Sequence, residues 1–219
     1  IAVAVPVDND DWNLRAYARI ADKLFLMAYD EHSEDGPPGP IASQAWFART
    51  VAQAIIGVPR NKVIVALGSY AYDWTQGDGA DALSIEDAWL SAHESDTTPR
   101  FDPASGNASF SYVEDAKRHD VWLADAATIY NQMITLRSAG LDSLALWRLG
   151  TEDPSIWQIF GAGHDGIPSP QAIVHVPAGT NVDIEGPGEI LRVGASPVAG
   201  VRAIRTNLSH FIVDESFVQ

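Results

Sequence analysis

Two Tyr–Asp pairs and one tryptophan are the residues of this sequence best suited to binding chemistry. Tyr29–Asp30 and Tyr72–Asp73 each follow an apolar run, and Trp147 ends a third. A phenol and a carboxylate are costly to bury, but the cost falls where they face a wet cleft at the carboxyl ends of parallel strands. Flat aromatic rings also suit the apolar faces of sugars. The alternative is that each pair begins an ordinary surface turn, and Tyr29–Asp30 alone does not decide between the two.

The elements that would position these residues alternate along the first part of the chain. Three apolar runs without alternation predict strands buried on both faces: residues 1–7, 23–28 and 62–68. Helical spacing predicts helices over residues 13–21 and 43–56, with Asn13 and Ser43 as N-caps. This β-α-β-α-β order with short connections predicts a parallel sheet with right-handed crossovers.

The pattern changes after Trp74. Residues 75 to about 120 are polar and rich in turn signals, which predicts an α+β insertion. It holds one short helix, near Ser84–Ala92, and strand-like pieces near residues 100–101 and 108–112. A helix is then predicted from about His119 to Ser138, followed by a strand over Ser143–Leu146 that ends at Trp147. After Pro168, short runs separated by Gly and Pro predict a small antiparallel β appendage.

Composition excludes several classes of function. The 219 residues include 46% hydrophobic and 20% charged residues, which describes an ordinary globular protein. A net charge of −15 repels phosphate backbones, so we expect no nucleic-acid partner. Apolar runs are too short for a membrane span, and the lack of cysteine excludes disulfides and cysteine-ligated metal. The chain begins with Ile1 rather than Met, so we expect it to be part of a longer protein.

Several motifs, in order along the chain, resemble glycoside hydrolase family 18, in particular its chitinase-like and envelope-glycan members. Residues 27–30 (MAYD) are similar to the family's M-x-Y-D at the end of barrel strand 6. Residues 68–74 (GSYAYDW) look like the end of strand 7, and Trp147 resembles the tryptophan of strand 8 that floors the sugar subsite. The segment around Trp122 resembles the exit from the family's α+β insertion.

The resemblance implies a fold class and a division of the chain. The fold is α/β: a partial (β/α)8 TIM-type barrel, strands 5–8, with an α+β insertion and a small C-terminal β appendage. The barrel half would occupy residues 1–74 and 119–165, the insertion residues 75–118, and the appendage or linker residues 166–219. Four strands of an eight-stranded barrel leave open edges, so a missing N-terminal half, a second copy or an unusual closure would complete it.

The resemblance also implies a chemistry. In family 18 a glutamate protonates the leaving oxygen, and the substrate's own N-acetyl group attacks the anomeric carbon. By resemblance, Tyr29 would donate to the acetamido oxygen, Asp30 would bind the sugar or tune nearby carboxylates, and Trp147 would stack on the ring. The substrate-binding subsites would be lined by Met27, Tyr72, Asp73 and Trp122.

The family's proton donor is not found in this sequence. Its D-x-x-D-x-D-x-E motif ends strand 4, which would precede Ile1. The similar-looking segment from Asp78 to Glu86 has the wrong spacing and follows no apolar strand. We therefore expect this chain to be part of a family 18-like protein that hydrolyses β-linked N-acetylated glycans, and to be inactive alone. The glycan would be chitin, peptidoglycan or an exopolysaccharide.

Two other functions stay open. One is a non-catalytic carbohydrate-binding or scaffolding module, and the other is a generic acidic α/β interaction domain. We expect no cofactor, and the acidic run Asp8–Asp11 fails the spacing of a calcium loop. The partners implied by the resemblance are an N-acetylated glycan and either the missing barrel half or polysaccharide deacetylase and glycosyltransferase domains of the same polypeptide. Family resemblance implies an extracytoplasmic location, periplasmic or at the cell surface.

Overall fold

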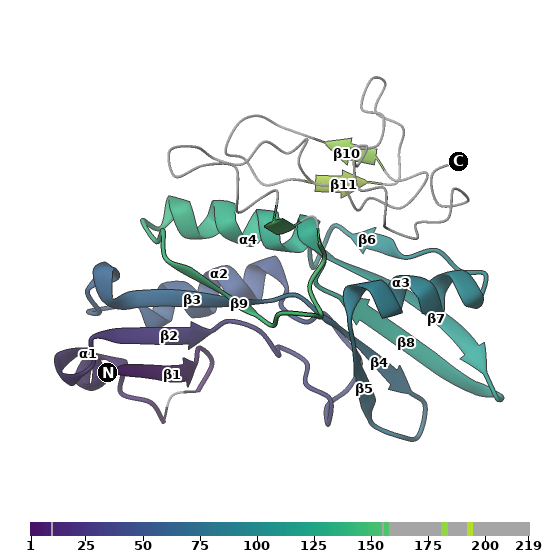
Figure 1. Cartoon of the computed structure of the whole chain (residues 1–219), viewed down its shortest axis with the longest axis horizontal. Coiled ribbons are helices and arrows are strands. Elements are labelled where there is room, and N and C mark those ends of the chain that lie inside the picture. The colour runs from purple at the N-terminus through teal and green to yellow at the C-terminus, as the bar shows by residue number, and fades with distance from the viewer. Residues whose placement is uncertain (10, 155, 158–180, 184–191, 195–219) are drawn as a thin grey trace.

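A four-stranded parallel sheet and a five-stranded antiparallel sheet form most of the molecule (Figure 1). The structure is a computed structural model, and it describes residues 1–9, 11–154, 156–157, 181–183 and 192–194. A third, short pair of strands, β10 and β11, joins Asn181–Asp183 to Arg192–Gly194 in antiparallel register. None of the helices in these described residues is both long and apolar enough to cross a membrane.

The parallel sheet has the strand order β1-β2-β3-β9. Its strands are β1 (Ala2–Pro6), β2 (Lys23–Met27), β3 (Val63–Gly68) and β9 (Leu144–Trp147). They alternate with α1 (Leu14–Ile20), α2 (Gln44–Ala54), the 3-10 turn η1 (Arg60–Lys62) and α4 (Ala126–Ser138). The predicted caps are present, because Asn13 accepts a hydrogen bond from Ala16 N and Ser43 accepts one from Trp46 N.

Helices cover one face of the parallel sheet. Leu24 and Leu26 of β2 and Val65 of β3 are fully buried against a core that includes Phe47 of α2 and Ile129 of α4. Burying a side chain of this size stabilises the fold by about 1.5–3 kcal/mol. Figure 1 shows α2 behind the sheet, so the face toward the viewer is the one that these helices leave open.

This one-sided cover corrects the prediction of strands buried on both faces for β1 and β2, whereas β3 agrees with it, since all of its residues except Ile64 are buried. Along β2, buried Leu24 and Leu26 alternate with the half-buried residues Lys23, Phe25 and Met27. The apolar run without alternation is therefore a strand with a helix-covered face and a partly exposed face. Sequence periodicity could not reveal this, because apolar residues occupy both faces.

The antiparallel sheet has the order β5-β4-β8-β7-β6 and carries one helix. Its elements are β4 (Ala71–Thr75), β5 (Ala80–Leu83), α3 (Ile85–Glu94), β6 (Arg100–Asp102), β7 (Asn107–Glu114) and β8 (Lys117–Leu123). The sheet begins at Ala71 and ends at Leu123, and so extends on both sides beyond the predicted residues 75–118. Figure 1 shows it beside the carboxyl ends of the parallel strands.

The predicted helix from His119 to Ser138 is wrong in its first part. Residues 119–123 belong to β8, which pairs with both β4 and β7, and the helix begins only at Ala126. The start is set by Asp125, whose carboxylate accepts hydrogen bonds from Ala127 N and Thr128 N. Strand pairing on two sides outweighs the weak helical periodicity of this segment. Of the predicted appendage, residues 166–219, the structure describes only 181–183 and 192–194, so most of this prediction lies outside the described residues.

Buried hydrogen bonds join the start of β7, in the antiparallel sheet, to the segments around the parallel sheet. The side chain of Asn107, fully buried at the start of β7, donates to Ala42 O at 3.0 Å. The hydroxyl of Thr128 on α4 donates to Gly106 O at 2.8 Å. Because a buried polar group that is left unpaired costs stability, these contacts hold the start of β7 against the loop before α2 and against α4.

Candidate functional site

The carboxylate of Asp30 lies at the junction of the two sheets, three residues after the end of β2. Its Oδ1 accepts a hydrogen bond from the Tyr70 hydroxyl and a second, at 3.2 Å, from the Tyr72 hydroxyl. Asp30 has a φ of +62°, a backbone conformation that is unfavourable for most residues with a Cβ. The two tyrosine donors therefore hold a carboxylate in one orientation, on a backbone that the surrounding contacts must stabilise.

Gly68 allows the aromatic residues to close around this carboxylate. A Cβ on Gly68 would lie 2.7 Å from Tyr70 Cε1 and 2.8 Å from Tyr29 Cβ, closer than real Cβ contacts come. The position lies at the end of β3, directly opposite Trp147 of β9 in the sheet register. The absence of a side chain thus lets Tyr29 and Tyr70 pack over the strand end.

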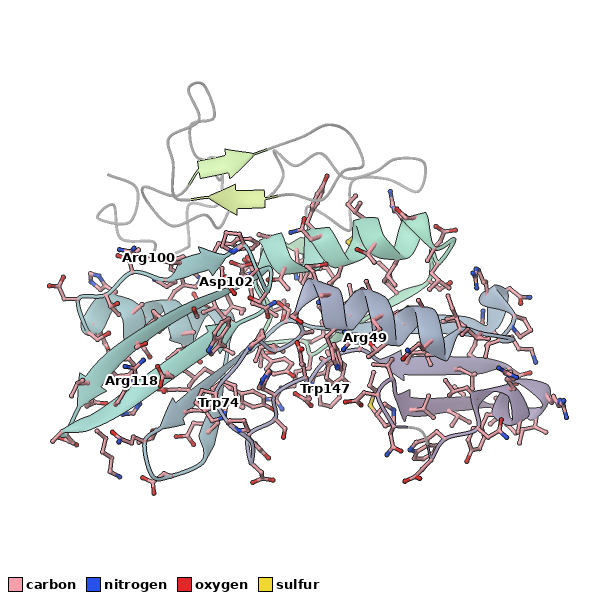
Figure 2. The ribbon with its side chains drawn as sticks, turned by 180° about the vertical axis from the view of Figure 1, so that it is seen from behind. Arg49, Trp74, Arg100, Asp102, Arg118 and Trp147 are labelled. Atoms are coloured by element: carbon pink, nitrogen blue, oxygen red, sulfur yellow. The ribbon has the colours of Figure 1, made fainter. Side chains whose placement is uncertain are left out.

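A continuous group of rings extends from Trp147 to Trp74. Tyr29 stacks on Trp147 with ring centroids 6.0 Å apart and an interplanar angle of 13°. Tyr29 contacts Tyr70 edge to face, and Tyr70 contacts Tyr72 in the same way at 5.3 Å. Trp74 packs on Tyr72, also at 5.3 Å, and Figure 2 labels the two tryptophans at the ends of this group. The indole of Trp147 is 49% exposed, so its ring is open to a ligand.

Burial and the Asp30 charge together keep the tyrosines protonated. Burial, and after it the nearby charge of Asp30, raises the pKa of Tyr29 to about 12. Burial, as the larger cause, and the charge of Asp30, as the second, also raise the pKa of Tyr70 and of Tyr72. At neutral pH all three phenols are therefore hydrogen-bond donors, as a site that binds an oxygen-rich ligand requires.

Hydrogen bonds between its two ends hold the loop after Asp30 together. The Glu31 carboxylate accepts hydrogen bonds from Ser43 N at 2.6 Å and from the Ser43 hydroxyl at 3.0 Å. Glu31 N donates to Ile41 O at 2.9 Å. Ile41, which is fully buried, packs against the cluster that contains Tyr70, Tyr72 and Trp74. Residues 31–43 therefore form one wall of the site.

The structure brings most of the predicted site residues together. Tyr29, Asp30, Tyr72 and Trp147 belong to the group just described. Trp122 lies on β8 directly opposite Tyr72 in the sheet register and packs against the same cluster. Met27 is the half-buried last residue of β2, on the face of the strand that also carries Phe25.

Asp73 lies on the other side of β4. Successive side chains of a strand point to opposite faces, so Tyr72 and Trp74 point toward the Asp30 group and Asp73 points away from it. Its carboxylate accepts a hydrogen bond from the Tyr112 hydroxyl at 2.6 Å and lies 3.0 Å from His119 Nδ1. Asp73 is thus not brought next to Asp30, although its motif resembles that of Tyr29–Asp30.

Tyr70 is the site residue that sequence reasoning missed. Its ring is buried, and its hydroxyl is one of the two donors to Asp30. The missed signal is the period of two over residues 70–74, which places Tyr70, Tyr72 and Trp74 on one face. The same period separates Asp73 from them.

The acidic segment between Asp78 and Glu86 forms no cluster with Asp30. Asp78 forms an exposed ion pair with Lys117 at 2.5 Å, and Glu86 lies in the first turn of α3, which Ser84 caps. In the part of the chain that the structure describes, no three His, Asp or Glu side chains are arranged to hold a metal ion. What the described residues of the site offer is hydrogen bonding at the Asp30 carboxylate and stacking on the rings around it.

Comparison with known proteins gives matches over most of the chain. The family model described as Glycosyl hydrolases family 18 matches residues 1–152. The uncharacterized glycosylase YvbX of Bacillus subtilis is 32% identical over 162 residues, which cover 71% of this chain and 47% of that protein. The cortical fragment-lytic enzyme of the same organism is 28% identical over 149 residues, 65% of this chain and 35% of the enzyme.

Solved structures match a similar share of the chain. The chitinase from Chromobacterium violaceum superposes with a TM-score of 0.65 at 29% identity and covers 71% of this chain. The spore cortex-lytic enzyme SleL of Bacillus cereus has a similar fold, with a TM-score of 0.67 at 23% identity. The aligned part is 52% of the chitinase and 39% of SleL. The chain thus spans about half or less of the length of the proteins that it matches.

Proposed function

Because the chain belongs to glycosyl hydrolase family 18, we propose that it forms the sugar-holding side of a site for β-linked N-acetylated glycans. The candidate substrates are chitin, peptidoglycan and related exopolysaccharides. The observation that carries the proposal is the exposed Trp147 indole stacked on Tyr29, beside a carboxylate fixed by Tyr70 and Tyr72. An apolar sugar face and its polar edge would be recognised together by such a combination.

Each side chain has a role in substrate-assisted hydrolysis. The sugar ring would stack on Trp147, and the Tyr29 hydroxyl would donate to the acetamido oxygen as it attacks the anomeric carbon. That hydrogen bond stabilises the charge that develops in the transition state. Asp30, with Oδ1 occupied by tyrosine donors, would use Oδ2 to accept from a sugar hydroxyl or amide. These groups orient and stabilise, and the proton donor must come from elsewhere.

The parallel sheet fits strands 5–8 of a (β/α)8 barrel, with β1, β2, β3 and β9 in that order. The antiparallel sheet would be the insertion between strands 7 and 8, and residues 166–219 would form a separate β appendage. Completion of the barrel requires another half, from the same polypeptide or from a partner. Deacetylase and glycosyltransferase domains are further partners within one polypeptide, at an extracytoplasmic location.

Without the D-x-x-D-x-D-x-E motif, the chain alone should bind glycans and not cleave them. The test titrates the purified chain with N-acetylglucosamine tetramer by calorimetry and follows cleavage by chromatography. We expect binding without turnover, and Trp147→Ala should weaken the affinity about tenfold, a loss of about 1.4 kcal/mol. Leu90→Ala is the control, because Leu90 is also an exposed apolar residue and lies on α3, outside the Asp30 group.

The outcomes separate the candidate functions. Sustained cleavage by the wild-type chain would overturn the proposed inactivity. Equal loss of affinity in Trp147→Ala and in Leu90→Ala, or no binding at all, would contradict the proposed glycan site. Binding with no cleavage even after the missing barrel half is supplied would favour the alternative, a carbohydrate-binding module.

A further inference from the structure

We propose that a second site, on the helix side of the parallel sheet, binds a sugar unit that carries a carboxylate. The site is a hollow of about 400 Å³ between the connection from β1 to α1 and the side of α2 that carries Trp46, Arg49 and Gln53. It shares no residue with the Asp30 group. The residues on which the argument rests are Trp12, Asn13, Arg15, Trp46, Arg49 and Gln53.

The charge of the hollow is opposite to that of the whole chain. Two guanidinium groups, Arg15 and Arg49, line it, and Asp8 is the acidic side chain among the described lining residues. The chain as a whole carries a net charge of −15. A locally basic hollow on so acidic a protein favours an anionic ligand, which the remaining surface repels.

Arg49 is free to take such a ligand. Within the described part of the chain it makes neither a hydrogen bond nor an ion pair, and Figure 2 shows it on α2, in front of the parallel sheet. Arg15 is fixed by its Nε, which donates to Ile56 O at 3.0 Å and leaves its terminal nitrogens available. A guanidinium fork matches the two oxygens of a carboxylate.

The other walls suit a sugar ring. Trp12 is 36% exposed and is supported from one side by Tyr17, with ring centroids 5.8 Å apart. Asn13 uses its Oδ1 to cap α1, accepting from Ala16 N at 3.0 Å, so its amide N–H groups are left as donors. An indole face with an amide donor beside it recognises a pyranose by stacking and by hydrogen bonds to hydroxyls.

These features together identify the ligand class. A neutral hexose would leave the Arg49 guanidinium without a partner, and a small carboxylate would leave the indole unused. A hexose bearing a carboxylate, such as a uronic acid or a sugar with a lactyl ether, uses both. The inference goes beyond the proposed glycan site at Asp30, since it rests on different residues and would stand if that site bound nothing.

The experiment uses three probes against the whole chain, with binding measured by saturation-transfer NMR titration. N-acetylmuramic acid carries ring and carboxylate, N-acetylglucosamine carries the ring alone, and lactate carries the carboxylate alone. We expect N-acetylmuramic acid to bind more tightly than either of the others. Arg49→Gln should weaken its binding at least about tenfold, because a charge-assisted hydrogen bond is lost. Arg19→Gln, an exposed arginine on α1 outside the hollow, is the control.

Two tryptophan variants distinguish binding at this site from binding at the proposed glycan site around Asp30. Trp12→Ala should abolish N-acetylmuramic acid binding and preserve binding of the N-acetylglucosamine tetramer, and Trp147→Ala should do the reverse. Equal affinity for N-acetylmuramic acid and N-acetylglucosamine, or an Arg49→Gln variant that binds like wild type, would overturn the inference. If only the tetramer failed to bind, the result would contradict the proposed glycan site around Asp30 and not the second site.

Discussion

The Tyr70 hydroxyl donates a hydrogen bond to Oδ1 of Asp30, a residue 40 positions earlier in the chain. The contact joins the end of the parallel sheet to the start of the antiparallel sheet. Tyr72 donates to the same oxygen at 3.2 Å, so both tyrosine donors meet at one oxygen of the carboxylate. The orientation of Asp30 thus depends on how the two sheets meet.

Removal of the Tyr70 hydroxyl should destabilise the fold. In Tyr70→Phe the Asp30 carboxylate keeps only the Tyr72 donor, and we expect the free energy of unfolding to fall by about 1–3 kcal/mol. Urea denaturation measures the change. Tyr17→Phe is the control, because Tyr17 lies on α1 away from Asp30. Equal stability of the two variants would show that the Tyr70–Asp30 hydrogen bond contributes nothing.

Alkaline pH should destabilise the protein through Tyr29. Its pKa is raised to about 12 in the folded protein, by burial first and by Asp30 second, while an unfolded tyrosine titrates near its ordinary value of 10.0. The stabilising contribution is complete below about pH 10 and is lost as pH rises through about 12, because the unfolded state releases its proton first. Urea denaturation between these pH values should give a shallower decline for Tyr29→Phe than for wild type. An identical decline would contradict the shifted pKa.

A methyl group at Gly68 should disrupt the site. In Gly68→Ala the new Cβ would meet Tyr70 Cε1 at 2.7 Å and Tyr29 Cβ at 2.8 Å, so both rings must move. Overpacking of this kind costs about 1–3 kcal/mol, and we expect the affinity for N-acetylglucosamine tetramer to fall with the stability. Gly79→Ala is the control, since its Cβ would come no closer than 3.7 Å to Glu34 O. Unchanged binding by Gly68→Ala would show that the ring positions do not matter.

Asp73 should matter for stability and not for glycan binding. Asp73→Ala removes the acceptor of the Tyr112 hydroxyl and the partner of His119, and we expect a loss of about 1.5–3 kcal/mol. Calorimetric affinity for the tetramer should stay within about twofold, because Asp73 points away from the Asp30 group. Asp81→Ala, an exposed residue opposite Asp73 on β5, is the control. A large loss of affinity at unchanged stability would restore Asp73 to the substrate-binding residues.

Much of the fold could be predicted from the sequence because its signals are local. The three strands before residue 70 follow from apolar runs, and Asn13 and Ser43 cap helices because their side chains reach backbone N–H groups two or three residues ahead. The family also followed from short motifs, and the match over residues 1–152 confirms it. Residues 119–123 were misassigned because pairing with two neighbouring strands outweighs their own periodicity.

By itself, then, the sequence predicted the α/β order of elements, the family and four residues that the structure brings together: Tyr29, Asp30, Tyr72 and Trp147. The tertiary structure alone decided that Tyr70 holds Asp30 and that Asp73 turns to the opposite face with Tyr112 and His119. The physical reason is that these contacts join residues about 40 positions apart, either where the two sheets meet or across strands β4, β8 and β7 of the antiparallel sheet. Their formation depends on sheet order and strand pleat, which no single stretch of sequence specifies.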